Sequence, residues 1–180
     1  MIAVQCHGKI GVLSAYLAAI VAFSYAAISL YWTLGGTLLL NTVGGSIENI
    51  ASQRGVLAYV LGAIASAFKI MGGLLALALV RPWGAMIPRR WLVASAVALS
   101  VVLVSYGGLL VVVGALVLLN IVHPSGVVDW TALRWHVLVW DMWFLLWGTL
   151  MALATVDYRK RIGQTAIGGI RFGVKRRLGE

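Results

Sequence analysis

The chain has 180 residues, of which 62% are hydrophobic and 11% are charged. Soluble domains are about half apolar and about one quarter charged, so this composition excludes a secreted disulfide scaffold, a disordered tail and a soluble nucleic-acid-binding module. With a formal net charge of +9, the sequence indicates an integral membrane protein with basic ends.

Little in the sequence indicates metal or redox chemistry. The single cysteine, Cys6, leaves no pair for a disulfide, for thiol exchange or for a zinc site. The three histidines, His7, His123 and His136, are scattered and match no metal-binding motif. We therefore expect no metal and no cofactor. Apolar sequence continues from Ile10 to Leu40, which is too long for the core of a cleaved signal peptide.

Four segments are long and apolar enough to cross a bilayer, which takes about 20 residues of helix. They cover residues 10–34, 56–80, 91–121 and 135–156. The predicted fold is therefore all-α, an integral membrane bundle of four transmembrane helices over residues 1–156. A basic tail follows at residues 157–180. Polar loops are expected at 35–55 and 122–134, and a short basic turn at 81–90.

The placement of lysine and arginine predicts the orientation. Eleven of the fourteen lie in the N-terminal segment, in the 81–90 turn or in the tail, whereas the other side holds only Arg54 and Arg134. Because cytoplasmic segments carry the excess of basic residues, both termini are predicted to be cytoplasmic. In the tail, six residues are candidates for binding anionic lipid headgroups: Arg159, Lys160, Arg161, Lys175, Arg176 and Arg177. Membrane lipids are the expected partners there, and nucleic acid is not expected because no nucleic-acid-binding fold accompanies the tail.

Lys69 is the most informative residue, because it lies near the middle of the second span. A lysine at that depth costs about 2.5–3.5 kcal/mol, so it must snorkel, form a pair or line a wet cavity. Small residues share its helix face, including Gly62, Ala65 and Gly72. They admit either a neighbouring helix or a ligand. Lys69 is therefore interpreted either as part of a structural ion pair or as a functional group, and the sequence favours neither.

Asp141 is the acid that lies within a span, and Lys69 could reach it along about one helical turn. A Lys69–Asp141 pair would cancel both charges. The alternative is that Asp141 faces water at the outer boundary of the membrane. The sequence favours neither interpretation of Asp141 over the other.

An aromatic stripe runs along the fourth span, with His136, Trp140, Trp143 and Trp147 at helical spacing. An interfacial aromatic belt accounts for its outer part. Trp143 and Trp147 lie deeper, where packing is favoured over a ligand cage. If they do line a pocket, a cation or a flat aromatic or isoprenoid molecule would suit it.

These residues converge on a candidate polar site in the outer half of the bundle. The predicted site consists of Lys69, Asp141, His136, Tyr31, Trp32, Glu48, Trp143 and Trp147. The third span, apolar apart from three serines and Tyr106, is interpreted mainly as scaffold. The pair Gly107-Gly108 in that span is interpreted as a close helix contact.

A resemblance supports this topology. The segment Tyr31-Trp32-Thr33-Leu34-Gly35-Gly36 resembles the Tyr-Trp-x-Leu-Gly-Gly signature of a family of small four-helix bacterial membrane proteins of unknown function. The fourth span, with Trp140-Asp141-Met142-Trp143 and then Trp147-Gly148, is similar to the closing helix of that family. In the family pattern a histidine often precedes Tyr-Trp by two residues, and Ser29 holds that position here. The resemblance implies a multi-pass protein of the bacterial cytoplasmic (inner) membrane, and no activity.

Two classes of function remain open. The first is a non-enzymatic membrane protein that binds or moves a small molecule, or acts as a subunit of a larger membrane complex, with homo-oligomerisation or other membrane subunits expected. The second is a membrane enzyme acting on a lipid or isoprenoid, with Asp141, Glu48 or His136 transferring protons. The sequence favours the first, because these titratable residues form no recognised catalytic motif. A third hypothesis is a purely structural or assembly role, with the basic tail as the main interaction.

Overall fold

The computed structural model describes the backbone of residues 2–178 and the side chains of residues 9–45 and 47–163. Within the described residues the fold is all-α and contains no strand. Its long helices are α1 (Ile2–Thr33), α3 (Val56–Ala78), α4 (Arg89–Leu118) and α6 (Asp141–Leu178). Shorter helical elements join them: η1 (Leu40–Thr42), α2 (Gly45–Gln53), η2 (Pro82–Met86), α5 (Trp130–Trp135) and the π-helical turn η3 (His136–Trp140).

Four helical segments are long and apolar enough to cross a membrane: Lys9–Thr33, Val56–Ala78, Arg89–Leu118 and Trp130–Gly163. Each overlaps one of the four predicted spans, so the chain has the composition and helix lengths of a multi-pass membrane protein. Helices satisfy their own backbone hydrogen bonds, which is why apolar runs of this length fold as helices in lipid.

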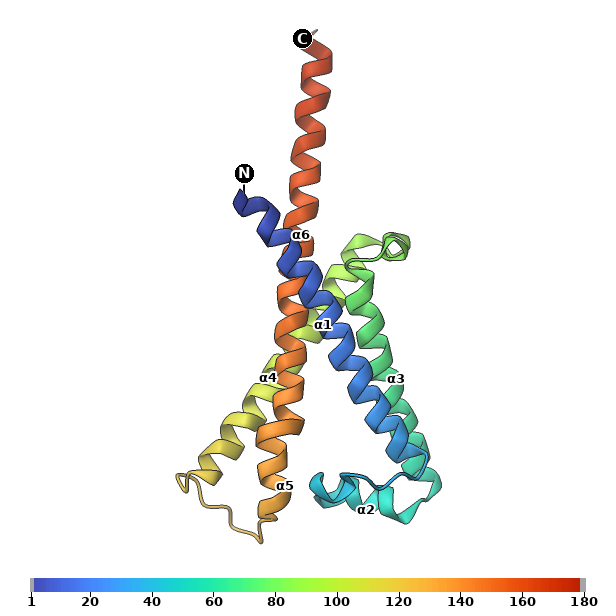
Figure 1. The fold of residues 1–180 in the computed structure, drawn as a ribbon, viewed down its shortest axis with the longest axis vertical. Coiled ribbons are helices and arrows are strands. Elements are labelled where there is room, and N and C mark those ends of the chain that lie inside the picture. The colour runs from blue at the N-terminus through green and yellow to red at the C-terminus, as the bar shows by residue number, and fades with distance from the viewer. Residues whose placement is uncertain (1, 179–180) are drawn as a thin grey trace.

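The helices form two antiparallel pairs that cross (Figure 1). α1 packs along α3, α4 packs along α6, and α1 joins the pairs by crossing α6, whereas α3 and α4 touch only slightly. Both chain termini and the α3–α4 connection lie at one end of the bundle, which we call the terminal end. At the opposite end, which we call the splayed end, the two pairs diverge.

The tightly packed core lies toward the terminal end. Ala15, Ala18, Ala19 and Ala22 form a stripe on α1 and are almost completely buried. Large side chains such as Leu92 and Met151 complete this cluster. Small residues let helix backbones approach closely, so the helices are tightly packed in this half of the bundle.

Two connections differ from the sequence prediction. The segment predicted as a polar loop at 35–55 contains η1 and α2, because Ile47 and Ile50 form an apolar face on a short helix. The fourth membrane-crossing segment begins at Trp130 rather than 135, because the Asp129 carboxylate caps α5 by accepting hydrogen bonds from the amides of Thr131 and Ala132, both 3.0 Å long. At its other end, α6 continues through Asp157, so the predicted tail starts within this helix.

Candidate functional site

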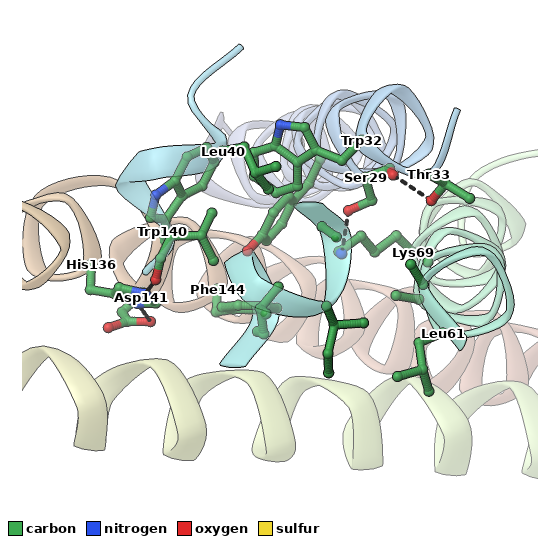
Figure 2. Close-up of a pocket in the computed structure, with 18 of the residues that line it drawn as sticks. Ser29, Trp32, Thr33, Leu40, Leu61, Lys69, His136, Trp140, Asp141 and Phe144 are labelled. Atoms are coloured by element: carbon green, nitrogen blue, oxygen red, sulfur yellow. Dashed lines mark hydrogen bonds and ion pairs between the residues drawn. The ribbon is translucent and has the colours of Figure 1, made fainter. Parts of the chain in front are cut away.

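A cavity of about 390 Å³ occupies the space between the helix pairs toward the splayed end (Figure 2). All four long helices, η1, α2 and η3 contribute to its lining. The lining is predominantly apolar and aromatic, with a few polar side chains that converge on it: Tyr25, Ser29, Thr33, Lys69, Tyr106, His136 and Asp141. Concave apolar sites with a few convergent polar groups are typical of small-molecule binding.

Lys69 enters the cavity from α3. Its Nζ atom donates a hydrogen bond of 2.6 Å to Ser29 Oγ and lies 4.2 Å from the centroid of the Tyr25 ring. A hydroxyl oxygen and the negative face of an aromatic ring both stabilise an ammonium group, but neither carries a full negative charge. Among the described residues, no carboxylate lies within ion-pair distance of Lys69. Its positive charge is therefore left without a direct counter-ion.

Asp141, almost fully buried at 4% exposure, is paired with His136 instead of Lys69. His136 Nδ1 lies 3.2 Å from Asp141 Oδ1, and His136 Nε2 lies 2.9 Å from the carbonyl oxygen of Val43. A carbonyl only accepts, so Nε2 carries a hydrogen and donates it to Val43. The contact with Asp141 then requires one more proton, on Nδ1 or on the carboxyl group. Either way the pair is neutral overall, so it does not cancel the charge of Lys69.

The π-helical turn explains how His136 and Asp141 meet. In a regular α-helix, residues five apart point about 140° away from each other. In η3 the amide of Asp141 bonds to the carbonyl of His136, an i→i+5 bond that adds one residue to the turn. This bond brings the two side chains onto the same face. The predicted stripe from His136 to Trp147 assumed regular α-helical spacing, and this turn interrupts it.

The segment between α1 and α2 closes the splayed end of the cavity through three side-chain hydrogen bonds. Trp32 Nε1 donates to the carbonyl of Leu38 (2.8 Å), and Trp140 Nε1 donates to Thr42 Oγ1 (3.2 Å). The third is the bond from His136 to Val43. This segment and α2, residues 38–53, form a cap over the cavity.

Replacing His136 with leucine is expected to loosen the cap. Leucine is similar in size to histidine but apolar, so the substitution removes the bond to Val43 and leaves Asp141 buried without its partner, which costs about 1–3 kcal/mol. Hydrogen–deuterium exchange in detergent should show faster exchange over residues 40–53. Arg134→Leu, an exposed position on α5, serves as the matched control. Equal exchange of this segment in wild type and His136→Leu would show that the histidine does not anchor the cap.

Aromatic rings form one wall of the cavity. Trp140 lies 5.4 Å from Trp32 and 6.0 Å from Tyr25, measured between ring centroids, and Phe144 lies 5.0 Å from Tyr25. Tyr106 of α4 meets Phe144 edge to face at 5.4 Å. Such a wall offers flat apolar surface to a bound molecule.

The cavity is most open on the side between α3 and α4. Three lining residues are classed as exposed, namely Ile47, Leu61 and Tyr106. They belong to α2, α3 and α4, and α3 and α4 make few contacts with each other.

Of the eight predicted site residues, Lys69, Asp141, His136 and Trp32 line the cavity. The other four do not. Tyr31 packs over Gly36, and Glu48 lies off the face of α2 that carries Ile47, Ile50 and Ala51. Trp143 Nε1 donates to the Val21 carbonyl of α1 (3.0 Å), and Trp147 is buried in the core against Gly72. These two tryptophans therefore pack helices together, which is the role that the sequence favours for them over a ligand cage.

Several lining residues were missed by the sequence analysis. Tyr25 and Ser29 lie at i and i+4 on the face of α1 whose i+7 position is the predicted Trp32, a spacing that could have identified them. Tyr106 belongs to the third span, so that helix contributes to the site as well as to the scaffold. The small-residue face of α3 divides in two: Gly72 and Gly73 are covered by Trp147 and Phe23, whereas Gly62 and Ala65 border the cavity.

Among the basic candidates for lipid contact, Arg161 is held by its own helix. Its Nε donates to Asp157 Oδ2 at 2.8 Å, and its Nη2 lies 3.5 Å from the Leu79 carbonyl at the end of α3. Arg159 and Lys160 are exposed. The side chains of Lys175, Arg176 and Arg177 lie outside the described residues.

The comparison with known protein families provides a match for this arrangement. The family described as "Protein of unknown function (DUF3995)" matches residues 22–151, which include every lining residue of the cavity. The chain belongs to the DUF3995 family. The match covers the cap and cavity of this DUF3995 protein, all of α3 and α4 and parts of α1 and α6, whereas the basic C-terminal segment lies outside it. No curated protein and no solved structure matches the chain.

Proposed function

We propose that this protein is a non-enzymatic membrane protein that binds a small anionic amphiphile, with a carboxylate or phosphate head and an apolar body, in the cavity between the helix pairs. The observation that carries the proposal is Lys69, a cation at mid-membrane depth that faces a largely apolar cavity without a counter-ion. An ammonium has three donors, and one of them is used by Ser29.

The apolar part of such a ligand has a matching surface. The aromatic wall and the apolar face of α2 line the remainder of the cavity, whose volume falls in the usual range for small-molecule sites. The exposed Leu61 and Tyr106 border an opening through which a longer chain extends toward lipid. Burying the head at Lys69 would satisfy a charge that otherwise costs free energy in the membrane.

Fluorescence quenching by brominated stearate tests the proposal, since Trp32 and Trp140 line the cavity and bromine quenches tryptophan at short range. In detergent, saturable quenching is expected with the fatty acid and not with its methyl ester, which has the same chain without the charge. Trp140→Phe should reduce the amplitude. Quenching that rises without saturation, or that is equal for acid and ester, would contradict the proposal.

A membrane enzyme acting on a lipid or isoprenoid is the second candidate. The observation that favours it is the neutral His136–Asp141 pair in the cavity wall, which can exchange a proton with a bound molecule. Trp143 and Trp147 lie outside the lining, so a cationic intermediate would instead meet the rings of Trp32, Trp140 and Tyr25. Recovering the bound molecule chemically unchanged after incubation with the purified protein favours binding over catalysis.

We also propose that the terminal end faces the cytoplasm of a bacterial inner membrane, because the basic residues concentrate there. Green fluorescent protein fused after Glu180 should fluoresce, since it folds in the cytoplasm. The same reporter fused after Ser125, in the α4–α5 connection at the other end, should remain dark. The reverse pattern would show that the orientation is inverted.

A further inference from the structure

A second hollow lies on the outside of the bundle at the terminal end, independent of the cavity above. It is a groove of about 990 Å³ between the start of α4 and α6. Three arginines surround it: Arg89 and Arg90 from α4, and Arg159 from α6. All three side chains are exposed.

The rest of the groove is apolar and follows the helix. Val93 and Val97 are four residues apart and form one row on α4. Ala94 and Ala98, which have the same spacing, form the neighbouring row. They lead from the arginines toward the middle of the membrane-crossing segment Arg89–Leu118. The groove thus combines a cationic end at the membrane boundary with an apolar floor inside the membrane.

Within the described residues, the three arginines have no acidic partner. Asp157 is the nearest acid along α6, and Arg161 is paired with it. Asp129 and Glu48 belong to the α4–α5 connection and α2, at the splayed end. Three guanidinium groups without a protein counter-ion favour an anion supplied from outside, and guanidinium suits phosphate because it donates hydrogen bonds in pairs.

We infer that this groove binds one anionic phospholipid, with its phosphate between Arg89, Arg90 and Arg159 and an acyl chain along Val93 and Val97. Such a lipid contacts both parts of the groove: its headgroup binds the arginines and its chain packs along the apolar rows. The site lies at a membrane boundary whichever way the protein is oriented. It does not depend on the ligand proposed for the cavity.

Native mass spectrometry of the detergent-solubilised protein tests this inference with dioleoyl phosphatidylglycerol and dioleoyl phosphatidylcholine, which share their chains. The wild type should retain the anionic lipid at least tenfold more tightly. The variant Arg89→Gln/Arg90→Gln/Arg159→Gln should lose that preference. Its matched control, Lys9→Gln/Arg81→Gln/Arg134→Gln, removes the same charge and should keep it. Equal losses in both variants would show a diffuse charge effect and overturn the site.

Two further measurements distinguish binding of a lipid from binding of a free phosphate. They also test whether a loss of binding is caused by misfolding. Ala94→Trp fills the groove at an exposed position without changing charge, and it should weaken phosphatidylglycerol binding at least fivefold at an unchanged melting temperature. Glycerol phosphate, which has the anionic head without chains, should not displace the lipid at equal concentration. Displacement by glycerol phosphate, or full binding by Ala94→Trp, would overturn the role of the acyl chain.

Discussion

Replacing Lys69 with methionine is expected to weaken binding of an anionic amphiphile by tenfold or more while leaving the bundle at least as stable as the wild type. The two effects have one cause. A lysine in the middle of a membrane costs about 2.5–3.5 kcal/mol, part of which Ser29 and the Tyr25 ring offset. Methionine has a similar length without the charge, so the cost disappears together with the group that would hold the ligand. A tenfold change in affinity corresponds to about 1.4 kcal/mol.

The measurement combines brominated-stearate quenching with a thermal melt in the same detergent. Lys69→Arg keeps the positive charge and should retain part of the binding. Arg81→Met removes one exposed charge at the terminal end, away from the cavity, and should change neither property. If Lys69→Met binds as the wild type does, the proposed site is wrong. If it loses stability instead, the lysine has a structural role.

Substituting Gly107 with leucine is expected to cause a large loss of stability. Gly107 packs directly against the backbone of α6: an added Cβ would lie 2.7 Å from the amide nitrogen of Leu145 and 2.9 Å from the carbonyl oxygen of Asp141. From the other side, a Cβ on Gly148 would lie 2.8 Å from the amide nitrogen of Val104. Two backbones in contact cannot yield as a flexible side chain can.

Overpacking a well-packed site costs about 1–3 kcal/mol and more where the neighbours cannot move, so Gly107→Leu should exceed 3 kcal/mol. The neighbouring Gly108 supplies a matched control, because its nearest atom beyond the helix is a side-chain carbon of Leu145 at 3.8 Å. Gly108→Leu should therefore lie near the wild type. Unfolding midpoints in a denaturing detergent titration measure both. Equal losses would mean that helix propensity, rather than the α4–α6 crossing, sets the effect.

This crossing also supports the candidate site. The carbonyl that Gly107 approaches belongs to Asp141, and the residue before Gly107 is Tyr106, which lines the cavity. Displacing α4 from α6 would therefore move two lining residues. The interpretation of Gly107-Gly108 as a close helix contact holds for the first glycine, because it faces α6 and the second lies about 100° around the helix.

The number and approximate limits of the four long apolar helices followed from the sequence alone, because apolar length and the cost of burying backbone polar groups are properties of each segment by itself. The same holds for the importance of Lys69 and Asp141, since a charge within a span is costly wherever its helix packs. Trp32 and His136 were also predicted as site residues from their positions along their helices, and both line the cavity.

The contact partners of these residues did not follow from the sequence, because they depend on how the helices rotate and cross. Asp141 pairs with His136 rather than Lys69, since the extra residue of the π-helical turn brings positions five apart together, and no α-helical periodicity predicts it. Ser29 meets Lys69 because α1 lies along α3. The cap over residues 38–53 and the contribution of Tyr106 likewise required the packed bundle. Sequence determined which residues must find a partner in the membrane, and tertiary structure decided which partner each one meets.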